Sequence, residues 1–153
     1  MFMKHKYLLL ILPALLLCLY ACKKAAQSKA ITLTGRWFIT KHDLKLLKGG
    51  VQVGQTIRTD YTSDDFDQFF DDGTGYQSAR GNNNSPSLNT FHYTFKDSTL
   101  TIYINASPAV VEKVTKLTAT EFAVHYETEI ADPNNPGQPA TEVDDYEFIR
   151  QAL

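Results

Sequence analysis

Apolar and polar residues alternate one by one along most of this chain, which is the pattern of β-strands with one buried and one solvated face. In the segment 91–95, three aromatic rings fall on one face, and His92 and Thr94 fall on the other. Residues 100–105 and 122–130 alternate in the same way. No stretch keeps the period of an amphipathic helix. The pattern therefore predicts an all-β, antiparallel fold.

Turn residues divide the alternating runs into short segments. Asp72-Gly73 is a strong hairpin signal, and polar loops rich in Asn, Pro and Gly occupy 81–86 and 132–137. The alternating segments are 34–41, 56–61, 66–70, 75–79, 89–95, 99–105, 110–117, 121–130 and 141–150. We expect one early segment to be a loop or half of a bent strand, which leaves about eight strands. We expect one helical turn within 42–50.

Short links favour a meander in which each strand pairs with the next along the chain. Closing such a meander removes its exposed sheet edges. We therefore expect residues 32–153 to form an antiparallel up-and-down β-barrel of about eight strands. A two-sheet β-sandwich is the alternative.

The first residues have a different character. A basic start with Lys4 and Lys6 precedes an apolar run at 7–20, which is shorter than the ~20 residues of a bilayer span. These are the parts of a secretory signal peptide. Leu19-Tyr20-Ala21-Cys22 resembles the lipobox of bacterial lipoproteins. The resemblance implies cleavage after Ala21 and acylation of Cys22, and two or three acyl chains anchor a protein stably to a membrane. An ordinary signal peptide with incidental cysteines is the alternative.

These features predict three parts: a signal peptide at 1–21, an acylated flexible tether at 22–31 and the β-domain at 32–153. The tether is rich in small and polar residues. Lys23 follows Cys22 at the position where an Asp would retain a lipoprotein in the inner membrane. We therefore expect a cell-envelope lipoprotein of the outer membrane, with the leaflet left open.

Charge excludes one class of function. The full chain has a net charge of −2, and loss of Lys4 and Lys6 with the leader changes it to −4. Without a basic face, the domain is not expected to bind nucleic acid. Eight acidic residues and no Lys or Arg lie within 121–147, and we interpret them as a solvated sheet face.

A second acidic group precedes the Asp-Gly turn. Its members are Asp60, Asp64, Asp65, Asp67, Asp71 and Asp72. They lack the alternating ligands and late Glu of an EF-hand loop. We interpret them as turn residues and solvent-facing carboxylates, with weak calcium binding left open.

Signals for catalysis are missing from the sequence. The histidines His42, His92 and His125 occur in no metal-binding spacing, and no Gly-X-Ser-X-Gly elbow is present. We expect no metal site, no cofactor and no enzymatic activity.

The first strand carries Gly35-Arg36-Trp37, and here the chain resembles the lipocalin family. Phe70 before Asp72-Gly73-Thr74, the run 116–122, and Arg150 near the end extend the resemblance over 33–150. It implies that Trp37 seals the closed end of a barrel and that Arg150 lies over its ring by a cation–π contact. The resemblance also implies a carrier of small apolar molecules.

Aromatic residues supply the candidates for a ligand pocket: Phe91, Tyr93, Phe95 and Tyr126. An eight-stranded barrel is filled by its side chains or holds one small ligand. Two hypotheses follow from this choice. The barrel binds a small hydrophobic molecule, or it is packed solid and docks another envelope protein.

Overall fold

The computed structural model describes residues 31–80 and 85–152. The signal peptide, the acylation of Cys22 and nearly all of the tether were predicted within residues 1–30, so they lie outside the described residues. In the ranges that are described, no helix has the length and hydropathy needed to cross a membrane.

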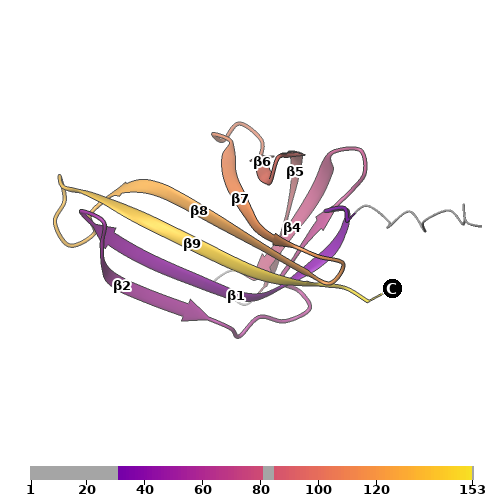
Figure 1. Cartoon of the computed structure of the whole chain (residues 1–153), viewed down its shortest axis with the longest axis horizontal. Coiled ribbons are helices and arrows are strands. Elements are labelled where there is room, and N and C mark those ends of the chain that lie inside the picture. The colour runs from indigo at the N-terminus through magenta and orange to yellow at the C-terminus, as the bar shows by residue number, and fades with distance from the viewer. Residues whose placement is uncertain (1–30, 81–84, 153) are drawn as a thin grey trace, which may run out of the picture. The chain divides into compact units, whose positions relative to one another are not determined.

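Nine antiparallel strands follow one another along the chain (Figure 1). Their bounds are β1 (Gly35–Lys48), β2 (Val51–Arg58), β3 (Phe66–Phe69), β4 (Thr74–Arg80), β5 (Pro86–Lys96), β6 (Thr99–Tyr103), β7 (Val110–Leu117), β8 (Glu121–Ala131) and β9 (Pro139–Arg150). Each strand from β3 to β9 pairs with the next, as the short links predict.

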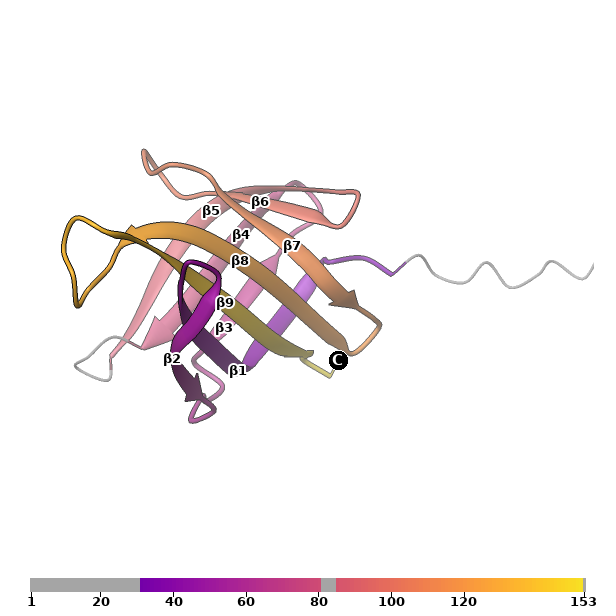
Figure 2. The same ribbon diagram turned by 60° about the vertical axis from the view of Figure 1, so that its left-hand side comes forward.

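Strand β1 closes the sheet into a barrel. Its first residues pair with β3, and nearly its whole length pairs with β9 on the other side. The predicted antiparallel barrel of eight strands is therefore confirmed, formed by β1 and β3 to β9, and the two-sheet sandwich is not found. Strand β2 is an addition that pairs with the far half of β1, beside which it lies in Figures 1 and 2.

The helical turn expected within 42–50 is wrong. Strand β1 continues to Lys48, and Gly49-Gly50 turns the chain into β2, which covers 51–58 rather than 56–61. Both glycines have positive φ angles, 56° and 79°, which a tight hairpin of this kind requires. The Gly-Gly pair therefore makes a β-hairpin where a helix was expected.

A β-bulge at Thr40 changes which side chains of β1 face inward. In the pairing with β9, Ile39 lies opposite Phe148 and Lys41 lies opposite Glu147, so Thr40 has no partner. Relative to strict alternation from Trp37 and Ile39, this extra residue places every later side chain of β1 on the other face. Trp37 and Ile39 point into the barrel before the bulge, and His42 does so after it.

The apolar core fills the end of the barrel where β1 begins and β9 ends. Trp37 and Phe69 have no exposed surface, and the Trp37 indole Nε1 donates a hydrogen bond to the Leu33 carbonyl oxygen at 2.6 Å. The rings of Trp37 and Phe122 lie 5.5 Å apart. Leu100, Val114 and Phe148 complete this plug. The remaining interior, toward the far ends of β1 and β8, is more polar and is where a cavity opens.

Candidate ligand-binding cavity

A cavity of about 230 Å³ lies among the inward-facing side chains of β3 to β9. Its walls are of two kinds. The apolar wall consists of Phe91, Ile102, Ile104 and Val110, and the polar wall consists of Asp67, Gln77, Glu112, Tyr126, Asp144 and Tyr146. The cavity therefore offers apolar contact on one side and carboxyl, amide and phenol groups on the other.

Space for the Phe91 ring comes from a glycine on the neighbouring strand. Gly75 is the register partner of Phe91, and a Cβ atom at Gly75 would lie 2.3 Å from the Phe91 ring. It would also lie 2.5 Å from the Gln68 carbonyl oxygen. The absence of a side chain at Gly75 thus lets the Phe91 ring lie across β4.

Strand periodicity brings three acidic side chains to the cavity. Asp67 precedes buried Phe69 by two residues, Glu112 precedes buried Val114 by two, and Asp144 precedes Tyr146 by two. Because residues two apart share one face of a strand, each carboxylate follows its neighbour into the barrel. Three separate strands, β3, β7 and β9, thus direct carboxylates into one space.

Asp67 is the most enclosed of these acids, with 6% of its surface exposed. Its Oδ1 atom is buried and has no hydrogen-bond partner among the described residues. Burial raises the pKa of Asp67 to about 7, the negative charge of Glu112 adds to the rise, and a hydrogen bond from Gln77 opposes it. An acceptor oxygen without a donor is costly to bury, so Asp67 is the most unusual group in the barrel.

Glu112 has a similar environment. Burial raises the pKa of Glu112 to about 7, and the charge of Asp144 adds to the effect. Asp144, by contrast, has a partner, since His42 Nε2 lies 2.6 Å from its Oδ1 atom. The His42 ring stacks on Tyr146 with centroids 4.1 Å apart and an interplanar angle of 4°. His42 thereby holds both Asp144 and Tyr146 in place.

Tyr146 keeps its proton. Burial raises the pKa of Tyr146 well above its ordinary value, and the nearby charge of Asp144 acts in the same direction. A neutral phenol can donate one hydrogen bond and accept others. Tyr146 therefore adds a polar but uncharged group beside the carboxylates.

The four aromatic candidates for a pocket do not all reach the cavity. Phe91 and Tyr126 line it. Tyr93 packs on the Phe69 ring at 5.0 Å, and its hydroxyl donates to the Phe70 carbonyl oxygen at 2.7 Å. Phe95 is 37% exposed near the end of β5 and is not among the residues that line the cavity. Successive inward residues of β5 thus step from the cavity toward the plugged end.

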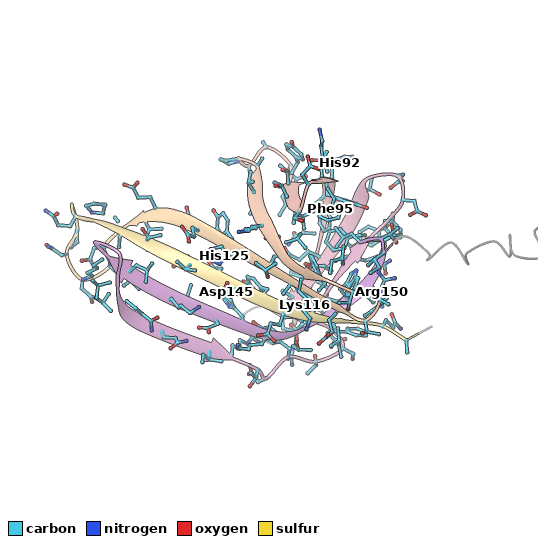
Figure 3. All side chains as sticks on the ribbon, in the orientation of Figure 1. His92, Phe95, Lys116, His125, Asp145 and Arg150 are labelled. Carbon is cyan, nitrogen blue, oxygen red and sulfur yellow. The ribbon has the colours of Figure 1, made fainter. Side chains whose placement is uncertain are left out.

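The three residues of the lipocalin resemblance meet at the plugged end. The Arg150 guanidinium carbon lies 4.3 Å from the centroid of the Trp37 ring, and Arg150 Nη2 donates to the Thr32 carbonyl oxygen. A Cβ atom at Gly35 would lie 3.8 Å from Arg150 Nη1. This is the arrangement that the resemblance implies for Gly35, Trp37 and Arg150. Figure 3 shows Arg150 near the end of β9, away from His125 and Asp145.

Several acids interpreted as solvent-facing are buried. Asp65 is 1% exposed, Asp132 is 3% exposed, and Asp67 and Asp144 line the cavity. Burial of Asp65 is compensated by hydrogen bonds, since Arg80 Nη2 and the Thr62 backbone N–H donate to its carboxylate at 2.9 Å. Lys48 pairs with Asp132 in the same way. Among the residues that the structure describes, no group of three or more His, Cys, Asp or Glu side chains is arranged to hold a metal ion.

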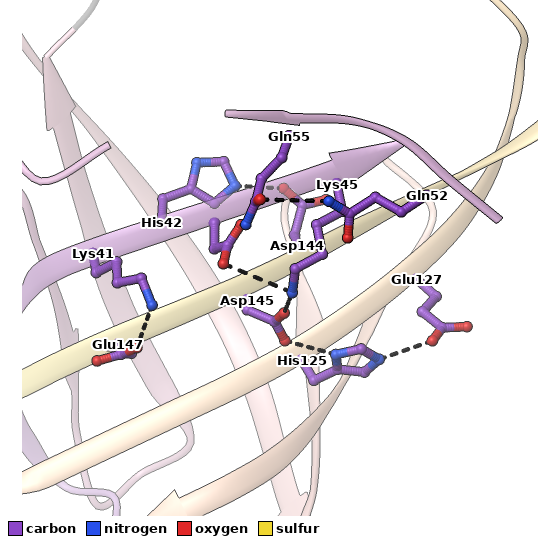
Figure 4. A network of polar contacts seen from close by, with 11 residues as sticks. Lys41, His42, Lys45, Gln52, Gln55, His125, Glu127, Asp144, Asp145 and Glu147 are labelled. Atoms are coloured by element: carbon purple, nitrogen blue, oxygen red, sulfur yellow. Dashed lines mark hydrogen bonds and ion pairs between the residues drawn. The ribbon is translucent and has the colours of Figure 1, made fainter. Parts of the chain in front are cut away.

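A larger groove, about 690 Å³, runs over the outer side of β1, β8 and β9. Figure 4 shows its ion pairs. Lys41 pairs with Glu147 at 2.9 Å, Lys45 pairs with Asp145, and His125 contacts Asp145 through Nδ1 at 2.7 Å. The hydrogen bond with Asp145 is the main cause that raises the pKa of His125. These charges are paired with one another. The inner cavity, by contrast, contains Asp67 Oδ1, which has no hydrogen-bond partner among the described residues, so we take the inner cavity as the candidate ligand site.

Comparisons with known proteins were made with family models, curated proteins and solved structures. No family model matches this chain, and no curated protein matches it. Among solved structures, the chain is similar to a lipocalin-like protein from Bacteroides uniformis, with a TM-score of 0.48 and 13% sequence identity. The match covers 78% of this chain and 98% of that one.

Proposed function

We propose that this chain is a lipid-anchored envelope protein whose barrel binds one small molecule without catalysing a reaction. The observation that carries the proposal is the two-walled cavity inside the barrel. Its volume of about 230 Å³ is somewhat below the ~300 Å³ at which ligand pockets commonly begin. The ligand is accordingly small, with an apolar part that contacts Phe91 and Val110.

The anchor belongs to the same proposal. Acylation of Cys22 after cleavage of the leader would hold the barrel at a membrane surface, by the lipobox in Leu19-Tyr20-Ala21-Cys22. Lys23 favours the outer membrane. In this arrangement the tether at 22–31 separates the barrel from the lipid surface.

A second candidate function is docking of an envelope protein partner, and strand β2 favours it. Among the described strands, β2 pairs only with β1, so its other edge is unpaired. Val51, Val53 and Ile57 on this strand are 66%, 53% and 56% exposed. An exposed strand edge with apolar side chains can accept a strand from another protein.

Native mass spectrometry of the full chain purified from envelope extract tests the first function. We expect a reproducible small-molecule adduct with the unaltered chain and none with Val110→Phe, which fills the cavity. Val111→Phe is the matched control, because Val111 is 54% exposed on the opposite face of β7. A bare protein mass, together with a cross-linked partner at β2, would favour docking instead.

A further inference from the structure

We infer that the cavity takes a small organic cation, in which an ammonium group faces Asp67 and Glu112 and an apolar portion contacts Phe91 and Ile102. This inference rests on the proposed function and specifies its ligand. It departs from the purely apolar ligand that the sequence implies.

The balance of charge inside the barrel is the first argument. Asp67, Glu112 and Asp144 line the cavity, and no lysine or arginine is found among its described lining residues. His42 contacts Asp144, which leaves Asp67 and Glu112 without a basic partner in the described chain. A buried carboxylate is normally paired with a cation, so the cavity lacks the group that would balance it.

The free oxygen of Asp67 is the second argument, and it is independent of the charge count. Asp67 Oδ1 is buried, has no donor within reach, and belongs to a residue that lines the cavity. A donor supplied from the cavity would satisfy it. An ammonium group is suited to this position because it carries three N–H donors and one positive charge.

The opposite wall argues against a bare metal ion. Phe91, Ile102, Ile104 and Val110 offer no ligand atoms, and the described acids are not arranged as a metal site. They do offer a surface for an alkyl or aromatic group of a few carbon atoms. Tyr126 and Tyr146 add aromatic rings beside the acids, and such rings attract organic cations.

Binding of a cation should strengthen as pH rises from about 6 to about 8. The groups that face the acids are Tyr126 from β8, Tyr146 from β9, and His42 from β1 through its contact with Asp144. In the folded chain the pKa values of Asp67 and Glu112 are raised to about 7. An entering cation favours their ionised forms, so protons are released on binding and alkaline conditions favour the complex.

The test uses isothermal titration calorimetry of the full chain with three probes of one shape and different charge. The probes are phenethylamine as the cation, phenethyl alcohol as its neutral counterpart and phenylacetate as the anion. We expect phenethylamine to bind about tenfold or more tighter than phenethyl alcohol, and phenylacetate not to bind. The affinity for phenethylamine should fall at pH 6.

Asp67→Asn and Glu112→Gln identify the groups responsible, because both variants remove charge and keep shape. Each should weaken phenethylamine about tenfold and leave phenethyl alcohol unchanged. Glu129→Gln is the control, since Glu129 is an exposed acid on β8 outside the cavity lining. Equal affinity for the alcohol and the amine, or no loss in Asp67→Asn, would overturn the cationic ligand and leave small-molecule binding intact. Failure of all three probes would also overturn it, and the adduct experiment above would then judge the proposed function separately.

Discussion

The Arg150 guanidinium lies over the face of the Trp37 ring, 4.3 Å from its centroid, and joins the last strand to the first at the plugged end of the barrel. The same guanidinium donates to the Thr32 carbonyl oxygen, so it also fixes the segment that leads into β1. Trp37 is fully buried beneath it. One side chain of β9 thus covers the core and fixes the segment that precedes β1.

Trp37→Ala should therefore destabilise the fold by about 3–5 kcal/mol, the range for truncation of a large buried aromatic residue. Urea unfolding followed by circular dichroism measures the change. A loss below ~1 kcal/mol would show that Trp37 does not act as the plug.

Gly75→Ala should destabilise the barrel by about 1–3 kcal/mol, as overpacking of a core does. The new methyl group would lie 2.3 Å from the Phe91 ring and 2.5 Å from a backbone oxygen, so the strand itself must shift. Gly54→Ala is the control, because a Cβ atom there meets only the Leu46 Cβ at 3.6 Å. Equal melting temperatures for the two variants would contradict the tight packing of Phe91 on β4.

Stability should fall as pH rises from about 5 to about 8. Asp67 and Glu112 have pKa values near 7 in the folded protein, against ordinary values of 3.8 and 4.5. Between these limits the folded state holds more protons than the unfolded chain, so raising the pH favours unfolding. His125, whose pKa is also raised, acts in the same direction.

Asp67→Asn isolates the contribution of one carboxyl group. At pH 8 the variant should be more stable than the unaltered chain, on the order of 1 kcal/mol, because it buries no charge. At pH 5 the difference should nearly vanish, since Asp67 is then protonated. Urea unfolding at the two pH values measures this, and a less stable variant at pH 8 would count against a charged, unpaired Asp67.

Asp65→Ala should cost about 3–5 kcal/mol, because it removes the buried carboxylate that pairs with the Arg80 guanidinium. Burial alone would raise the pKa of Asp65, but hydrogen bonds from Thr62 and Arg80 outweigh it and lower the value. Asp60→Ala is the control, since Asp60 pairs with Arg58 at the surface at 2.8 Å. That exposed pair should contribute about 0–1 kcal/mol. Similar losses in chemical denaturation would contradict the contrast.

The barrel could be predicted from sequence because its strands alternate cleanly and its turns are short. Phe122 and Val124 are buried in the structure, as their alternation indicates. The prediction failed at 42–50, where Leu46 and Leu47 are adjacent apolar residues that interrupt the alternation. In the pairing with β2 the extra residue is Val53, so β1 continues to alternate and Leu46 and Leu47 face opposite sides of the sheet.

The cavity was harder to predict, because acidic residues were taken as solvent-facing wherever they occurred. Period-two spacing from Phe69, Val114 and Tyr146 points to Asp67, Glu112 and Asp144 as inward residues. That signal was present in the sequence. The contact of His42 with Asp144 could not be found in this way, since it depends on a bulge and on pairing between the two ends of the domain.

The bulge at Thr40 also sets the chemistry of the interior at a single position. Unbroken alternation through Thr40 would turn Lys41, Asp43 and Lys45 into the barrel and His42 out of it, while Trp37 kept its place. The lumen would then acquire lysines of its own beside its acids. Pairing of this one residue in the β-ladder would thus convert an acid-lined chamber into an internally neutralised one, with the plugged end of the barrel unchanged.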